Sequence, residues 1–170
     1  MKNTALVFLI ISALITGGCA DEVFYRGGSS WPERRERVMP MSATVQQRVS
    51  QAAPDIHFSG NSHAISPAEA NLLAKAAPEL KQMIQDYPDL MLIIEGYCDD
   101  RGSAAQNSKL GLQRADAVRQ ILIDQGVPFT HLRVESKGNT ELLCSTRDKE
   151  CRQANRRVHF TAVHRVVDPD

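Results

Sequence analysis

Residues 95–118 read EGYCDDRGSAAQNSKLGLQRADAV, and they carry the chain from a strand into a helix. The segment that leads into them, LMLIIE (90–95), is nearly all apolar and is bounded by turn residues. Such a run favours a central strand buried on both faces. After a polar loop, apolar residues recur at helical spacing and predict a helix over about 107–125, which Gly126 ends.

Residues 66–69, SPAE, predict the start of an earlier helix. Serine is a common N-cap, proline fits the first helical position, and glutamate falls three residues after the cap. We expect the inner face of this helix to carry six apolar residues: Leu72, Leu73, Ala76, Leu80, Met83 and Ile84. Pro78 lies inside the pattern and predicts a kink or a break near Ala77.

Three further segments, at 55–58, 133–136 and 157–163, complete the pattern as strands. The order β-α-β-α-β-β predicts an α+β domain over residues 54–166. Two helices are expected to pack on one face of a small mixed four-stranded sheet.

The N-terminus carries an export pattern. Lys2 is followed by Ala5–Ile15, an apolar run too short to span a bilayer. The next residues, TGGC (16–19), resemble the bacterial lipoprotein signal, although a threonine stands where leucine is usual. This resemblance implies removal of residues 1–18, a covalent lipid on Cys19 and, with alanine following it, sorting to the outer membrane. A plain cleaved signal with an unrelated cysteine is the alternative.

Residues 19–53 combine glycines, prolines and a mixed-charge run with weak periodicity, which predicts a flexible tether. A short helix within 41–51 and a partner-binding motif around Trp31 are the alternatives. Residues 167–170 are expected to form a tail.

Export implies an oxidising compartment, where disulfides form. Cys144 and Cys151 bracket a polar loop, and we predict that they form a disulfide. Two free thiols remain an alternative, and a zinc site is disfavoured because no histidine lies near with ligand-like spacing. Cys98 is expected to be a small buried residue.

The chain carries 20 Lys+Arg and 20 Asp+Glu, so its formal net charge is zero. A nucleic-acid-binding protein usually has a basic surplus. We therefore expect no nucleic-acid partner. The adjacent carboxylates of Asp99 and Asp100 point opposite ways in an extended segment, which disfavours shared acid–base catalysis.

Arg114 falls on the same helical stripe as Leu110 and Ala117. A guanidinium beside an apolar face needs an acceptor, and helical side chains lean toward the N-terminus. Arg114 should therefore reach toward Asp99, at the carboxyl end of the preceding strand, where pockets form in such sheets. A carboxylate and a guanidinium that converge there suit a ligand with both an ammonium and a carboxylate. The alternative is a structural Asp99–Arg114 salt bridge without a ligand.

The same segment resembles the OmpA-like domain, in the form found in peptidoglycan-associated lipoproteins. The family pattern G-H-x-D-x-x-G-x-x-x-x-N-x-x-L-x-x-x-R-A has eight fixed positions. Seven of them match in register, and Tyr97 stands where histidine is usual: Gly96, Tyr97, Asp99, Gly102, Asn107, Leu110, Arg114 and Ala115. DRGS (100–103) and NRRV (155–158) also resemble family motifs, and the resemblance extends from Asp55 to Val163.

This resemblance implies a non-enzymatic protein that binds peptidoglycan noncovalently, through the diaminopimelate of the stem peptide. Asp99 would accept from the ammonium, Arg114 would hold the carboxylate as a two-pronged donor, and Asn107 would support the same pocket. Arg101, Ser103 and Asn61 would be further contacts, although Ser59 stands where the family usually has an aspartate. Asn155 and Arg156 would be structural or at the pocket edge.

The implied protein is a lipid-anchored link between the outer membrane and the cell wall, with its domain in the periplasm. No metal is expected, and no cofactor other than the covalent lipid. Two alternatives remain: an accessory component of an envelope-spanning machine, such as a secretion apparatus or the Tol system, and a domain that no longer binds the wall.

Overall fold

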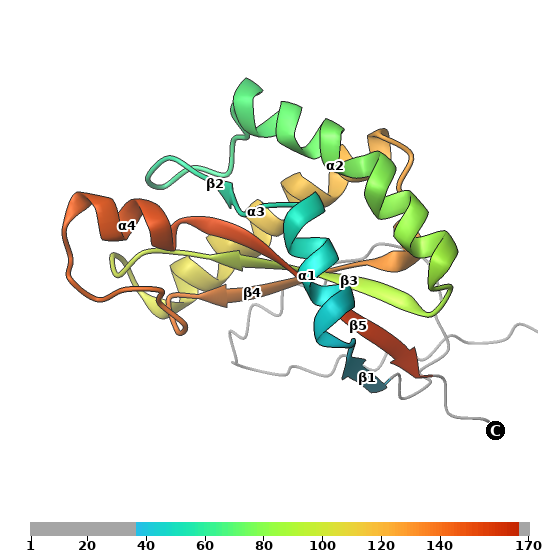
Figure 1. The fold of residues 1–170 in the computed structure, drawn as a ribbon. Helices are drawn as coiled ribbons and strands as arrows, with labels where there is room; N and C mark the ends of the chain where they lie inside the picture. Colours follow the sequence, from blue (N-terminus) through green and yellow to red (C-terminus); the bar gives the residue numbers. More distant parts are fainter. Residues whose placement is uncertain (1–36, 167–170) are drawn as a thin grey trace, which may run out of the picture. The chain divides into compact units, whose positions relative to one another are not determined.

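The computed structural model of the protein describes residues 37–166 (Figure 1). The expected signal (1–18), the lipidation site Cys19, the first part of the expected tether and the tail (167–170) lie outside the described residues. Within the described part, no helix is both long enough and apolar enough to cross a membrane.

One mixed sheet forms the centre of the domain. It holds β1 (Arg37–Pro40), β5 (Arg157–Val166), β3 (Leu90–Tyr97) and β4 (Leu132–Gly138) in the order β1-β5-β3-β4. β2 (Ile56–His57) pairs with the start of β5. β3 and β4 are parallel, and the other pairs are antiparallel. Every residue of β3 is buried, which confirms the predicted central strand.

Helices α1 (Ala43–Ala52), α2 (Pro67–Asp86) and α3 (Ala104–Asp124) share one apolar core with the sheet. A short 3-10 turn, η1 (Phe129–His131), precedes β4, and α4 (Lys149–Asn155) precedes β5. The predicted α+β class with a mixed sheet is confirmed, but the sheet in the described residues has five strands rather than the expected four, because β1 pairs with β5. The predicted order corresponds to β2-α2-β3-α3-β4-β5, so β1, α1 and α4 are additions to it.

The prediction of a flexible tether is wrong for residues 37–53. β1 pairs with the end of β5, and α1 buries Val45 and Val49 in the core. The Gln46 side chain also bonds β5, donating to Phe160 O at 3.0 Å and accepting from Ala162 N at 2.8 Å. The apolar pattern of α1 is weak because only two of its positions are buried. The alternative of a short helix in this segment is confirmed.

Helix α2 begins as predicted, with the Ser66 hydroxyl accepting from Glu69 N at 3.2 Å and proline in the first turn. The expected break near Ala77 is wrong, because the helix continues through Pro78. Pro78 lies on the exposed side, where water can solvate the carbonyl that its ring leaves unbonded. Leu72, which was expected to face inward, is 38% exposed.

Helix α3 begins at Ala104, earlier than predicted, because Ser103 and Gln106 form a capping box. It packs very closely on β3 where two glycines meet. A Cβ atom built on Gly96 would lie 1.9 Å from Gly111 O, and one built on Gly111 would lie 2.3 Å from Ser136 Oγ. This close approach fixes α3 over the carboxyl end of β3.

Candidate functional site

A cavity of about 800 Å³ opens beyond the carboxyl end of β3. Four segments line it: the loop after β2, the loop after β3, the first turns of α3, and α4. The polar and charged residues of the lining include Asn61, Asp99, Arg101, Asn107, Lys109, Arg114, Lys149, Arg152 and Arg156. We call Asp99, Asn107 and Arg114 the cavity floor, and Lys149, Arg152 and Arg156 the α4 wall.

Asp99 is 9% exposed, and it pairs with Arg156 rather than with Arg114. Its Oδ2 accepts from Arg156 Nη1 at 2.9 Å, and its Oδ1 accepts from the backbone N–H of Arg101 at 3.1 Å. A carboxylate has about four acceptor positions, so capacity remains for a donor in the cavity. The strand register explains the pairing: Gly96 of β3 lies opposite Val158 of β5, which brings Arg156 beside Asp99.

Arg114 is fully buried, and its guanidinium stacks 5.2 Å from the centroid of the Phe58 ring. Its N–H groups donate to three backbone carbonyls and one thiol: Ser62 O at 2.9 Å, Tyr97 O at 2.8 Å, Ser59 O at 3.1 Å and Cys98 Sγ at 3.5 Å. The side chain thereby ties the loop after β2 to the end of β3.

These contacts change the role expected of Arg114. An arginine carries five N–H donors, so four bonds leave one for a ligand, and a two-pronged grip would require a protein bond to break. No ion pair joins Arg114 to Asp99, so the alternative of a structural salt bridge between them is wrong. Burial is the main cause that lowers the pKa of the Arg114 guanidinium, and the nearby charge of Arg156 lowers it further. Cys98 and Asp99 raise it, but by less. Behind the cavity therefore lies a buried positive charge that forms no ion pair with a carboxylate of residues 37–166.

Asn107 shapes the loop after β3 from the first turn of α3. It is 5% exposed, and its Nδ2 donates to Arg101 O at 2.7 Å. Its own backbone carbonyl accepts from the Cys98 thiol at 3.3 Å. Cys98 is buried as expected, and burial is the main cause that raises the pKa of its thiol.

The loop residues predicted from the family motif divide into two groups. Asn61, which has a positive φ of 50°, and Arg101 line the cavity. Ser103 does not line it, because its hydroxyl caps α3, where it accepts from Gln106 N at 3.3 Å. The expected contact from Ser103 is therefore absent from the cavity lining.

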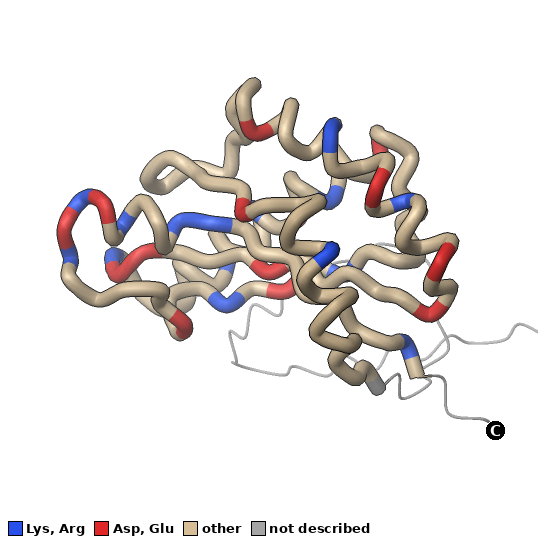
Figure 2. Tube along the Cα trace, viewed as in Figure 1, with Lys and Arg blue, Asp and Glu red and all other residues tan. Residues whose placement is uncertain are grey.

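Lys149 and Arg152 of the α4 wall are the part of the site that the sequence did not reveal, whereas Arg156 was expected to be structural or at the pocket edge. Arg156 pairs with the floor, and Lys149 and Arg152 add two positive charges that no motif indicated. The available signal was Asp148, an N-cap residue whose Oδ1 accepts from Cys151 N at 2.7 Å. Charged residues gather along the loop and helix at this end of the sheet (Figure 2).

The disulfide between Cys144 and Cys151 forms as predicted, with the two Cα atoms 5.7 Å apart. The two sulfur atoms bond each other, so the zinc alternative is wrong. Asn155, which is 1% exposed, closes the other end of the loop by donating to Cys144 O at 2.9 Å and accepting from Leu143 N at 2.7 Å. Both ends of α4 are thus held.

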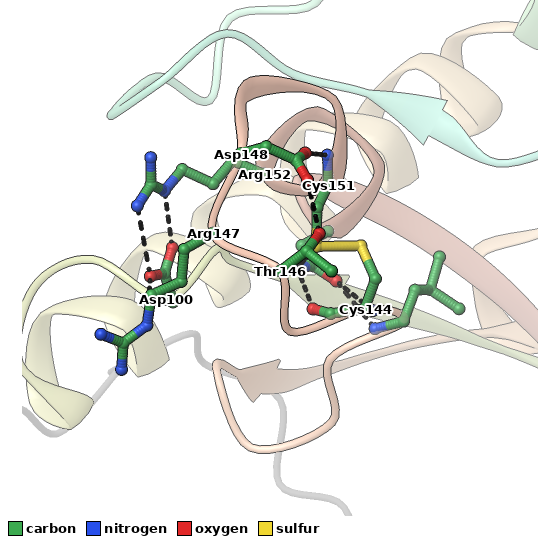
Figure 3. The surroundings of a disulfide bond; sticks show 9 residues. Asp100, Cys144, Thr146, Arg147, Asp148, Cys151 and Arg152 are labelled. Carbon is green, nitrogen blue, oxygen red and sulfur yellow. Dashed lines mark hydrogen bonds and ion pairs between the residues drawn. A yellow bond between two sulfur atoms is a disulfide. The ribbon is translucent and has the colours of Figure 1, made fainter.

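Asp100 connects α4 to the loop after β3. Figure 3 shows its carboxylate between Arg152 and Arg147, at 2.8 Å from Arg152 Nε and 3.6 Å from Arg147 Nε. The hydrogen bond from Arg152 is the main cause that lowers the pKa of Asp100. Asp99 and Asp100 therefore point to different partners, as expected for neighbours in an extended segment.

The fold and the site together define a class of protein: a small α+β domain with a positively charged pocket beyond the carboxyl end of its central strand. The OmpA family model matches residues 57–156, and the chain belongs to this family.

Two curated proteins illustrate the similarity. The probable lipoprotein YiaD of Escherichia coli (strain K12) is 35% identical over 107 residues, which span 63% of this chain and 47% of that protein. The peptidoglycan-associated lipoprotein of Brucella melitensis biotype 1 is 35% identical over 102 residues, with 60% of this chain and 58% of that protein covered. The chain thus spans about half the length of the curated relatives that it matches.

The fold has a counterpart among solved structures. The crystal structure of the peptidoglycan-associated lipoprotein from Burkholderia pseudomallei aligns with a TM-score of 0.57 and 27% identity, covering 64% of this chain and 88% of that one. The resemblance and the fold class inferred from the sequence are confirmed.

Proposed function

We propose that this protein binds peptidoglycan noncovalently, and that the cavity receives the diaminopimelate of the stem peptide. The observation that carries the proposal is that Asp99 and Arg114 line one cavity without being paired to each other. The names of the similar lipoproteins from Brucella and Burkholderia support it.

Each end of a diaminopimelate headgroup has a complementary group in the cavity. The ammonium suits the remaining acceptor positions of the Asp99 carboxylate. The carboxylate suits the positive potential produced by Arg156 and by the buried charge of Arg114 behind it. Arg156 is the better direct donor, because Arg114 has only one N–H without a protein acceptor.

We further propose that a lipid on Cys19 anchors the chain in the outer membrane, with the domain in the periplasm. The sequence resemblance at residues 16–19 and the oxidising compartment that the Cys144–Cys151 disulfide requires support this placement. The expected result is a mature chain that begins at a lipidated Cys19 by mass spectrometry. A Cys19→Ser variant should leave the membrane fraction, and its retention there would contradict the anchor.

Retention of the full-length protein on purified sacculi tests the binding site. Asp99→Asn keeps the side-chain size but removes the charge, and we expect it to weaken binding by about tenfold, the loss of one charged hydrogen bond. Arg156→Gln should also weaken binding. Asp116→Asn is the matched control, because Asp116 lies outside the cavity lining, is about half exposed and pairs with no described residue other than Arg119.

Thermal unfolding of each variant separates loss of binding from loss of fold. Equal retention of the wild-type protein, Asp99→Asn and Arg156→Gln would contradict the proposed site. A loss of retention in Asp116→Asn as large as that in Asp99→Asn would show that the effect is not specific to the cavity.

A further inference from the structure

The cavity has many more positive groups than a zwitterionic headgroup needs. Six positively charged side chains line it: Arg101, Lys109, Arg114, Lys149, Arg152 and Arg156. Asp99 is the single carboxylate in the same lining. A headgroup with one ammonium and one carboxylate is matched by one group of each sign. Arg152 and Arg156 pair with aspartates and Arg114 donates to backbone carbonyls, but three cations have no ion pair with the described residues: Arg101, Lys109 and Lys149. Because the whole chain has a formal net charge of zero, this excess is local.

We infer that the cavity is built for a peptide with at least one free carboxylate beyond the zwitterionic headgroup, and that Lys149 and Arg152 of the α4 wall bind it. This inference rests on the proposed function and specifies its ligand. The wall would make the protein select stem peptides whose neighbouring carboxyl group is free rather than amidated.

Lys149 and Arg152 both keep N–H donors for a ligand, although the charge of Arg152 is already paired with Asp100. Asp100 engages Arg152 through Nε at 2.8 Å and Nη2 at 3.5 Å, which leaves Nη1 for a ligand. Lys149 is exposed and forms no ion pair with the other described residues. An anion between them would meet donors from adjacent turns of one helix.

Helix α4 is held at several points, so its backbone presents a fixed binding surface. The Cys144–Cys151 disulfide joins the helix to the preceding loop, and Asp148 and Asn155 bond its two ends. Ligand binding therefore orders few protein groups, which lowers the entropic cost of binding. A charged carboxylate gains from such a surface, whereas a carboxamide of the same shape does not.

A matched pair of muropeptides tests the inference. One is a disaccharide tripeptide with a free α-carboxyl group on its glutamate, and the other is the same fragment with an α-carboxamide. Calorimetric titration of the full-length protein in detergent should show tighter binding of the free acid by about five- to tenfold.

Removal of the wall charges should abolish that preference. In the double variant Lys149→Gln/Arg152→Gln, the two fragments should bind equally. Lys149→Gln alone should lose part of the preference. Because Lys149 is exposed, we expect this single variant to fold even if the double variant does not. Lys75→Gln/Arg133→Gln removes the same charges outside the cavity lining and should keep the full preference.

The outcomes separate the inference from the function on which it rests. If the wild-type protein binds both fragments equally well, the role of the α4 wall is overturned and the proposed function stands. If the preference survives in Lys149→Gln/Arg152→Gln, the wall is again overturned. If neither fragment binds, the proposed function itself fails.

Discussion

The cavity floor and the α4 wall hold their charges in different ways. The floor is part of the core: β3 is buried throughout, Arg114 is fully buried, and α3 approaches β3 through two glycines. The wall lies at the surface, where a disulfide, a buried asparagine and ion pairs fix a short helix. A change in the floor should therefore cost the whole domain stability, whereas a change in the wall should alter a local surface.

The largest effect is expected where the floor is tightest. Gly96→Ala places a Cβ atom 1.9 Å from Gly111 O, so α3 must move away from β3. We expect a loss of more than about 3 kcal/mol in the free energy of unfolding, as for severe overpacking. Urea denaturation measures it.

Gly60→Ala is the matched control, because a Cβ atom there meets nothing within 4 Å. We expect this variant to stay within about 0.5 kcal/mol of the wild-type protein, as is usual at such surface positions. A Gly96→Ala protein as stable as Gly60→Ala would show that the floor does not depend on close backbone packing.

The next largest loss of unfolding free energy is expected when the disulfide of the wall is removed. The double variant Cys144→Ser/Cys151→Ser opens a short ring, and the loop-entropy model gives a loss of about 2–3 kcal/mol. Denaturation with and without a reductant measures the same quantity in the wild-type protein. The variant itself should not respond to the reductant, and a wild-type protein that keeps its full stability when reduced would contradict the role of the disulfide.

A smaller loss is expected from Asn155→Ala, which leaves the disulfide intact. The side chain bonds Cys144 O and Leu143 N from a buried position, and its removal leaves those backbone groups without partners. We expect a cost of about 1–2 kcal/mol in unfolding free energy. Gln153→Ala, at an exposed position of the same helix, provides the comparison, and equal stability of the two variants would remove Asn155 as a wall support.

The smallest effect is expected outside both regions, at the pair of His159 Nδ1 and Asp55 Oδ1, 2.7 Å apart. The hydrogen bond to Asp55 is the main cause that raises the pKa of His159. Burial by itself raises the pKa of Asp55. The hydrogen bond from His159 and the charges of His159 and Arg157 outweigh it, so the pKa of Asp55 is lowered overall.

The sign of each shift gives the pH window of this pair. A raised histidine pKa stabilises the fold below the unfolded value of 6.5, and this contribution is lost as the pH rises through the folded value. A lowered aspartate pKa stabilises the fold above 3.8, and this contribution is lost as the pH falls through the folded value. The pair should therefore be most effective between these two values.

Both side chains are about one-third exposed, so solvent screening limits the contribution to about 0.5 kcal/mol. His159→Gln should lower the urea midpoint slightly at pH 5.5 and leave it unchanged at pH 8.5. An equal difference at both pH values would exclude the ion pair as its cause.

Local signals in the sequence predicted the elements of the floor. Ser66 and Pro67 are a local signal for the start of a helix, and the apolar run of β3 is long enough to identify a buried strand. The family motif then identified Asp99, Asn107 and Arg114, all of which line one cavity. Helix α1 was expected only as an alternative to a tether, because two buried valines give little periodicity. Helix α4 was missed because it has only seven residues.

The sequence by itself determined the fold class, the disulfide and the three floor residues that meet at the end of β3, because caps, apolar spacing and motifs act over a few residues. Only the tertiary structure decided which of these groups pair. Asp99 meets Arg156 because β5 lies against β3 in a register that opposes Gly96 and Val158. Arg114 instead donates to the backbone carbonyls of Ser59 and Ser62, because the loop after β2 folds over it, and to that of Tyr97 at the end of β3. Charge partners depend on strand register and loop path, which no local pattern encodes.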